Sequence, residues 1–356
     1  MSRERMLLGW MMSGRNVLAT NLAQRRAAAC HGEIARRAAL SESVSRSLSS
    51  GPRSAVPSQS WKVYKAKQSL SQNFIVDKRI ARRIAELLHD TSEGGKAVVE
   101  VGPGKGAITA PLLDLYPKMR AVEIDRRSVY YLGTALPGVR VVHGDVLQYD
   151  WKALAAETGE RISVIGNLPF SVTSQILFSL FDSAPVIRSA LVTLQLEVAQ
   201  RVCAPPGKKP YGLLSVVTRL YGDPKFVFTI PASAFRPRPD VTVGVVRVDF
   251  PAERPRFDVS ECDLRIVIRA AFHQRRKMLR QSLKKLLAEK EVTLPEEFAT
   301  KRPEQLEPLQ FVHLTRIIFG KGSTPPGVAV WRGKLQDEAR YMASEDAAEG
   351  EGDEEE

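Results

Sequence analysis

The chain of 356 residues is 44% hydrophobic and 26% charged, which is enough for one full-sized core and excludes a fibrous or wholly disordered protein. The formal net charge is +12 although eight of the twelve residues of the segment 345–356 are acidic, so the rest of the chain is strongly basic, as is typical of proteins that bind a polyanion. Cys30, Cys203 and Cys262 form no CxxC pair, and no apolar run approaches the roughly 20 residues of a membrane-spanning helix, so we expect no metal site, no disulfide framework and no membrane partner.

Residues 1–60 have the composition of an organellar transit segment. They contain nine arginines and eleven serines, only three acidic residues, and neither lysine nor aspartate. We therefore predict a disordered transit segment here. The arginine bias favours the mitochondrion over the plastid, and a plain disordered arm is the alternative.

The segment 61–253 reads as an α/β domain. A helix is predicted over 78–88, where Ile80, Ile84 and Leu87 have helical spacing. Short buried strands are then predicted at 97–101, 119–124, 139–143, 162–165 and 189–195, with helical or loop segments between them. This alternation indicates a mostly parallel, doubly wound, Rossmann-like sheet. Two further β-rich stretches, 225–230 and 242–249, predict an antiparallel edge hairpin.

The pattern after residue 254 becomes helical. Helices are predicted at 264–271, 278–287 and 308–319, which indicates a small helical C-terminal domain over 254–322. The tail 323–356 is rich in glycine and charge and ends in a glutamate run, so we predict that it is disordered.

A glycine-rich turn follows the first strand, with Gly102 and Gly104 on either side of Pro103. Glycines at such a turn let a ligand approach the backbone closely. The spacing GxGxG differs from the GxGxxG of dinucleotide-binding proteins, in which the pyrophosphate needs a fitted turn and a helix N-terminus. The turn therefore favours S-adenosylmethionine, which carries no phosphate, over NAD.

Acidic residues follow the second and third strands. Glu123 lies about twenty residues beyond the glycine turn, where ribose hydroxyls are bound in related sheets. Asp145 follows the third strand and could accept a hydrogen bond from the adenine amino group of the cofactor. Each could alone be an ordinary solvated carboxylate. Because the ends of parallel strands meet at one edge of a sheet, the three features together predict one cofactor site.

The fourth strand ends in Asn167, Leu168, Pro169 and Phe170, a sequence similar to the (N/D/S)PP(Y/F) motif of amino-methyltransferases. The lone pair of an exocyclic adenine amine is delocalised into the ring, so the amine is a poor nucleophile until acceptors hold its protons. The Asn167 side-chain oxygen and the Leu168 carbonyl can do this. Phe170 would stack on a base that is unpaired or flipped out, and catalysis would come mainly from positioning.

The region from about residue 65 to 319 resembles the KsgA/RsmA-type small-subunit rRNA adenine dimethyltransferases. The resemblance lies in the stretches 71–75, 102–106, 123–125, 144–147, 167–170, 195–201, 211–216, 235–241 and 272–277. It implies that Asn73 and Ile75 help to enclose the cofactor beside Gly102, Glu123, Asp145 and Asn167.

The same resemblance implies a substrate and a partner. The substrate would be two adjacent adenines in a hairpin loop near the 3′ end of small-subunit rRNA, presented by the immature small ribosomal subunit, and single-stranded loops expose bases for such stacking. We expect the protein to act as a monomer.

Two further features are candidates for RNA binding. The basic run Arg275, Arg276 and Lys277 could contact phosphates, although such runs are also common on solvated helix faces. Phe235 precedes a proline-rich turn and could line the base pocket, or equally could be a buried hairpin aromatic.

Two other functions compete with this interpretation. An Erm-like enzyme acting on large-subunit rRNA would share the glycine turn and the Asn167 to Phe170 motif, but not the segment 272–277. A non-catalytic mitochondrial transcription or ribosome-assembly factor would bind nucleic acid without chemistry. The intact Asn167 to Phe170 motif argues that chemistry is retained.

Overall fold

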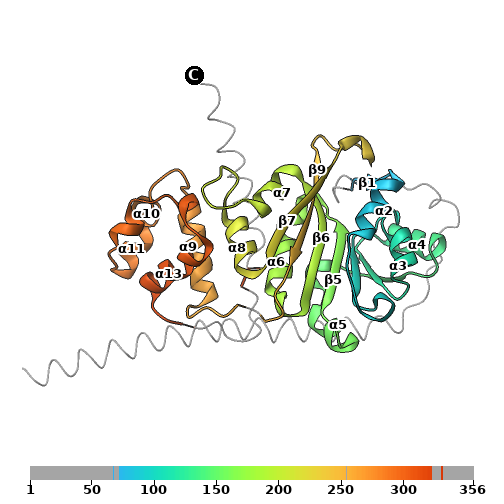
Figure 1. Cartoon of the computed structure of the whole chain (residues 1–356), viewed down its shortest axis with the longest axis horizontal. Helices are drawn as coiled ribbons and strands as arrows, with labels where there is room; N and C mark the ends of the chain where they lie inside the picture. Colours follow the sequence, from blue (N-terminus) through green and yellow to red (C-terminus); the bar gives the residue numbers. More distant parts are fainter. Residues whose placement is uncertain (1–66, 68–71, 254, 323–329, 332–356) are drawn as a thin grey trace, which may run out of the picture. The chain divides into compact units, whose positions relative to one another are not determined.

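A seven-stranded sheet forms the centre of the computed structural model (Figure 1), which describes residues 67, 72–253, 255–322, 330 and 331. The strands lie in the order β4-β3-β2-β5-β6-β9-β7. Their bounds are β2 Val98–Val101, β3 Arg120–Glu123, β4 Arg140–His143, β5 Ile162–Asn167, β6 Ile187–Gln195, β7 Asp223–Ile230 and β9 Val243–Asp249. Strands β2 to β6 pair in parallel, and β9 is antiparallel to both β6 and β7. The predicted doubly wound sheet with an antiparallel edge pair is confirmed.

The chain order reverses between β2 and β5, which are neighbours in the sheet although β3 and β4 lie between them in sequence. Loops that leave such a pair of strands diverge to opposite faces, and the crevice between them is where open α/β sheets bind ligands. The predicted glycine turn follows β2 and the predicted Asn167 motif ends β5, so both lie at this point.

Helices cover both faces of the sheet because alternate strand residues point to opposite sides. Val98 packs into a core cluster with α2 and α3, whereas its neighbour Val99 packs into the cluster with α5, α6 and α8. Helix α4 lies beside β3 and β4, and α7 lies beside β9. The bounds of the helices are α2 Lys78–Glu86, α3 Thr109–Leu115, α4 Arg126–Ala135, α5 Trp151–Thr158, α6 Thr173–Asp182, α7 Leu196–Cys203 and α8 Leu213–Tyr221. No helix in these residues is long and apolar enough to cross a membrane.

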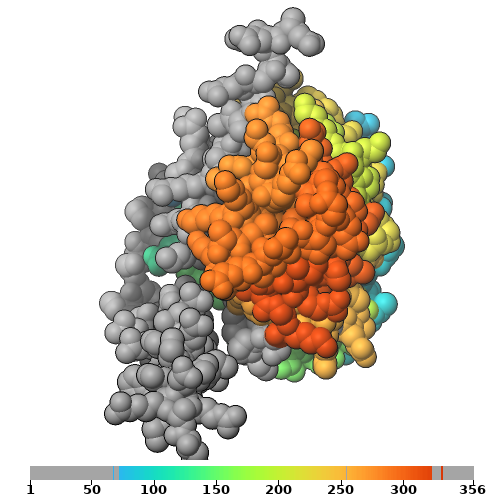
Figure 2. Space-filling view, turned by 90° about the vertical axis from the view of Figure 1, so that its left-hand side faces the viewer, coloured from blue at the N-terminus to red at the C-terminus, as the bar shows by residue number. Residues whose placement is uncertain are grey.

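The C-terminal helices gather on one face in Figure 2, and two of them, α9 and α13, pack against α8 (Figure 1). Their bounds are α9 Glu261–Phe272, α10 Leu279–Ser282, α11 Lys284–Lys290, α12 Glu296–Ala299 and α13 Pro308–Phe319. The ring of Phe272 stacks on Phe311 at 5.6 Å, and the Tyr211 hydroxyl donates to the Leu306 carbonyl at 2.8 Å. The single helix predicted over 278–287 was wrong: it is divided at Leu283, a buried residue with non-helical backbone angles between α10 and α11.

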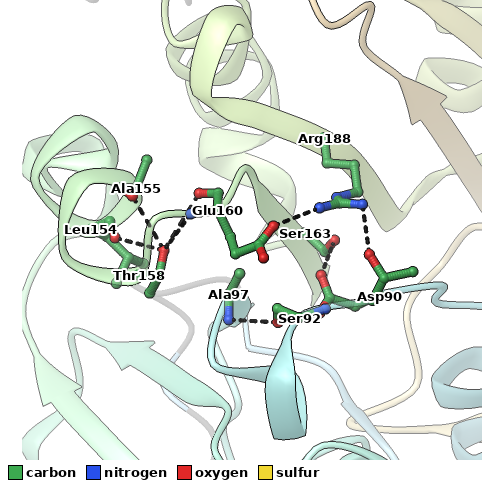
Figure 3. A network of polar contacts seen from close by, with 10 residues as sticks. Asp90, Ser92, Ala97, Leu154, Ala155, Thr158, Glu160, Ser163 and Arg188 are labelled. Atoms are coloured by element: carbon green, nitrogen blue, oxygen red, sulfur yellow. Dashed lines mark hydrogen bonds and ion pairs between the residues drawn. The ribbon is translucent and has the colours of Figure 1, made fainter.

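Polar side chains join the amino ends of the central strands (Figure 3). Ser163 in β5 donates to Asp90 at 2.7 Å, and Arg188 in β6 donates to Glu160 at 3.2 Å and to Thr91 at 2.9 Å. These contacts lie at the opposite edge of the sheet from the predicted site. They tie β5 and β6 to the segments that precede β2 and β5.

The tail was predicted to be disordered from residue 323, and this is wrong for Val330 and Trp331, which are 2% and 1% exposed. The backbone N–H groups of both residues donate to Asp182 Oδ1 at 2.9 Å. The Trp331 ring stacks on Phe178 at 6.3 Å and meets Tyr221 edge-on at 5.9 Å. A single large aromatic side chain thus attaches this part of the tail to α6 and α8. The predicted transit segment 1–60 and the acidic segment 345–356 lie outside the described residues.

We expect Trp331→Ala to lower the free energy of unfolding by about 3 kcal/mol, because truncation of a fully buried tryptophan removes its packing and leaves a cavity. Trp331→Phe retains much of the ring contact and should lose less than half of this amount. Urea denaturation followed by circular dichroism measures both. Equal stability of the alanine variant and the unaltered chain would show that the tail contributes nothing to the core.

Candidate active site

A cavity lies at the carboxyl ends of strands β2 to β5, and most predicted site residues line its wall. They are Asn73, Gly102, Gly104, Glu123, Asp145, Asn167, Leu168, Pro169 and Phe170. These residues come from five separate segments of the chain, and the sheet brings them together because parallel strands end at the same edge. The cavity wall therefore unites the glycine turn, the two acids and the Asn167 motif.

Glu123, the last residue of β3, is joined to the glycine turn. One carboxylate oxygen accepts from the Gly104 N–H at 3.1 Å and the other from the Asp125 N–H at 2.8 Å. The side chain is 5% exposed, and burial raises the pKa of its carboxyl. Gly104 has φ +55°, and a Cβ there would lie 2.7 Å from the Phe74 ring, so only glycine fits. The acid and the turn form one preorganised wall.

Asp145 caps the short turn that follows β4. One of its carboxylate oxygens accepts from the Leu147 N–H at 2.9 Å. The other accepts no hydrogen bond from a described residue, so it is available to the amino group of an adenine ring. Ile124, which follows Glu123 in the chain, is 52% exposed and provides an apolar surface on the cavity wall.

Asn167 ends β5 with its amide held on both sides. Its Nδ2 donates to the Asn73 carbonyl at 2.7 Å, and its Oδ1 accepts a short hydrogen bond from the Thr193 hydroxyl. The Leu168 carbonyl accepts no hydrogen bond from the described residues, and Phe170 is half-buried in the cavity wall. Two oxygen acceptors and one aromatic ring are therefore close together at the end of a single strand.

The segment before α2 crosses the cavity wall. Gln72 Nε2 donates to Asp125 at 3.1 Å, and the strand β1, Phe74–Ile75, pairs with β8, Phe235–Arg236. The side chain of Ile75 is 5% exposed and belongs to the core. It borders a smaller adjacent cavity and not the main one, so the structure does not place it among the cofactor contacts predicted for it.

Glu100, in β2, is a buried acid close to this wall that sequence reasoning did not single out. It is 1% exposed, and its Oε2 has no hydrogen-bond partner among the described residues. Burial, together with the nearby charge of Glu123, raises the pKa of Glu100 to about 8. The side chain is therefore mostly protonated at neutral pH.

We expect Glu100→Gln to flatten the pH dependence of stability. A carboxyl with a folded-state pKa of about 8 and an ordinary value of 4.5 stabilises the fold at low pH, and this contribution is lost as pH rises from 4.5 to 8. The glutamine resembles the protonated acid and does not ionise. The melting temperature of the unaltered chain should fall from pH 6 to pH 9 by several degrees more than that of the variant. Parallel curves would contradict a buried, titrating Glu100.

The predicted RNA-binding residues have different surroundings. Phe235 is 0% exposed in the core, so its predicted place in a base pocket is wrong, and the alternative of a buried aromatic holds. Arg275 is half-buried, donates to the Lys209 carbonyl and pairs with Glu304 at 3.2 Å, so it helps to fasten the loop before α8. Arg276 and Lys277 are exposed in the turn after α9. Only these two of the basic run offer a freely solvated charge.

Thr193, which is hydrogen-bonded to Asn167, is a second residue beside the site that sequence reasoning missed. It lies inside a strand that reads as continuously buried, and nothing in its local pattern separates it from a core residue. Its contact with Asn167 depends on the pairing of β5 with β6, which only the folded sheet reveals.

The strand order, the glycine turn and the acids at successive strand ends define a Rossmann-like S-adenosylmethionine-dependent methyltransferase. The cavity fits this cofactor: Glu123 can accept from ribose hydroxyls, Asp145 from the adenine amino group, and Ile124 can cover the adenine ring.

Comparison with known proteins extends this result. The family described as ribosomal RNA adenine dimethylase matches residues 63–318. Ribosomal RNA small subunit methyltransferase A of Salinibacter ruber is 41% identical over 265 residues, which cover 74% of this chain and 89% of that protein. The protein of the same name from Porphyromonas gingivalis is 41% identical over 71% of this chain and 98% of its own length. A dimethyladenosine transferase structure from Plasmodium falciparum shares the fold, with TM-score 0.54, 20% identity, and coverage of 67% and 95% of the two chains.

The chain therefore belongs to the ribosomal RNA adenine dimethylase family. It is an S-adenosylmethionine-dependent rRNA adenine dimethyltransferase, which confirms the fold, cofactor and reaction predicted from the sequence.

Proposed function

We propose that this protein dimethylates the amino nitrogens of two adjacent adenines in the 3′-terminal hairpin loop of small-subunit rRNA, and so aids the biogenesis of the small subunit. The observation that carries the proposal is the pair of acceptors at the end of β5, Asn167 Oδ1 and the Leu168 carbonyl, on the wall of the cofactor cavity. The small-subunit names of the relatives support the choice of RNA.

The residues at the end of β5 would act by positioning. The two acceptors hold the two protons of the adenine amino group, so that its nitrogen lone pair turns away from the ring and toward the cofactor cavity. Phe170 stacks on the extruded base. When bound, S-adenosylmethionine supplies an electrophilic methyl group, and no strong base is needed before the transfer because the amine loses its proton afterwards.

The test incubates the purified chain with radiolabelled S-adenosylmethionine and immature small ribosomal subunits, and maps the modified nucleotides by primer extension. Dimethyladenine at two adjacent positions in the 3′-terminal hairpin is expected. Label in large-subunit rRNA would instead indicate an Erm-like specificity. Tight RNA binding with no label would indicate an assembly or transcription factor.

Arg276 and Lys277 are proposed to contact rRNA phosphates, because both are exposed after α9 whereas Arg275 is engaged with Glu304. The double variant Arg276→Gln/Lys277→Gln should weaken RNA binding and reduce its salt dependence, because fewer counterions are released. Filter binding at several salt concentrations measures this. An unchanged salt slope would count against the contact.

We also propose that residues 1–60 direct the protein to mitochondria and that it acts as a monomer. The arginine- and serine-rich composition of the segment supports import, with plastids as the alternative. Fusion of residues 1–60 to a fluorescent protein tests the localisation of the protein in cells, since a diffuse cytosolic signal would exclude both organelles.

Light scattering of the purified chain measures its mass in solution, and the mass of a dimer would contradict the proposed monomer.

A further inference from the structure

Thr193 contacts both groups that are proposed to hold the target amine. It lies on β6 directly opposite Asn167 of β5 in the parallel register. Its hydroxyl donates to Asn167 Oδ1, and its carbonyl accepts from the Leu168 N–H at 3.3 Å. One residue of the neighbouring strand therefore contacts the side chain of the first acceptor and the backbone of the second.

These contacts leave the Asn167 amide only one orientation. A backbone carbonyl accepts and never donates, so the group facing the Asn73 carbonyl must be the amide nitrogen, at 2.7 Å. The amide oxygen then faces Thr193, whose hydroxyl must donate to it. With one lone pair of Oδ1 used by this bond, the other is left for a proton of the incoming amine.

The hydroxyl is unexpected for this position. Thr193 is 0% exposed, and its neighbours Val192 and Leu194 are equally buried aliphatic residues. A valine has nearly the same shape and would fill the site without burying a polar group. Buried polar groups in proteins normally have a hydrogen-bond partner. In the part of the chain that the structure describes, the Thr193 side chain makes no other hydrogen bond than the one to Asn167.

We propose that Thr193 is a positioning residue for methyl transfer, whose hydroxyl orients the Asn167 amide so that Oδ1 faces the adenine amine. This rests on the acceptor role proposed for Asn167. Through Asn167 the same chain of hydrogen bonds reaches the Asn73 carbonyl, so the orientation of the acceptor is coupled to the segment that crosses the cofactor cavity.

The test compares Thr193→Val with Thr193→Ser in the full-length chain. The valine variant should lose about fivefold to tenfold in kcat, as expected when one neutral hydrogen bond that orients a reacting group is removed. The KM for S-adenosylmethionine and the melting temperature should change little, because valine fills the same space. The serine variant, which restores the hydroxyl, should recover most of kcat. Thr315→Val, at a 0% exposed threonine in α13, is the matched control and should leave kcat unchanged.

Combining Thr193→Val with Asn167→Ala separates positioning from a general structural effect. If the hydroxyl acts through Asn167, the double variant should be no slower than Asn167→Ala alone. A further fivefold loss in the double variant, or full activity of Thr193→Val, would overturn the proposal. Should Asn167→Ala itself keep full activity, the acceptor role of Asn167 would fail first, and the two failures are thereby distinguished.

Discussion

Asn167→Ala should reduce kcat for methyl transfer on the order of 100-fold while RNA affinity stays within about twofold. Removal of one preorganised hydrogen-bonding group from a reacting centre typically has an effect of this size. The alanine cannot hold a proton of the amine, and the remaining acceptor, the Leu168 carbonyl, cannot orient the lone pair alone. The phosphate contacts proposed for Arg276 and Lys277 lie outside the cavity wall, so binding of the rRNA hairpin should persist.

Single-turnover kinetics with saturating cofactor measure the chemical step, and filter binding measures the RNA affinity. Gln200→Ala removes an exposed amide from α7, outside the cavity wall, and serves as the control that should retain full activity. A parallel loss of activity and RNA binding in Asn167→Ala would contradict the role assigned to this side chain. It would instead indicate that the variant deforms the RNA surface.

Glu123→Gln should weaken the binding of S-adenosylmethionine by roughly 10- to 100-fold, the range expected for lost hydrogen bonds to a charged group. The amide nitrogen of glutamine would face either the Gly104 N–H or the Asp125 N–H, and two donors cannot bond each other. The variant should therefore also loosen the glycine turn. Isothermal titration with the cofactor measures the change in affinity.

The pH dependence of cofactor binding supplies an independent check. Because burial raises the pKa of Glu123, this carboxylate takes up a proton at a higher pH than an exposed glutamate. Protonation removes the acceptor, so cofactor affinity should fall as pH decreases, and it should fall less in Glu123→Gln. Glu86→Gln, an exposed change in α2, should follow the unaltered protein. If Glu123→Gln binds the cofactor normally at every pH, the ribose-binding role is wrong.

The sequence alone determined the α/β sheet and most of the cofactor wall. Strand and helix periodicities are local, and parallel strands all end at one edge, so residues placed just after strands, such as Gly102, Glu123 and Asp145, must meet there. The Asn167 to Phe170 turn was found in the same way. Each of these residues combines a chemical signature with a position relative to one element.

The tertiary structure alone decided which residues are buried and which distant groups meet. Phe235 and Ile75 look available in the sequence but face the core, and Arg275 pairs with Glu304. Trp331 lies in a tail whose composition indicates disorder, yet its ring stacks on the ring of Phe178.

Thr193 shows the same limit at the active site. Its local pattern is that of a buried strand, and its role appears only when β6 pairs with β5 and brings its hydroxyl to Asn167. Such contacts join residues far apart in sequence. They depend on strand register and on the packing of whole elements, and no local propensity encodes them.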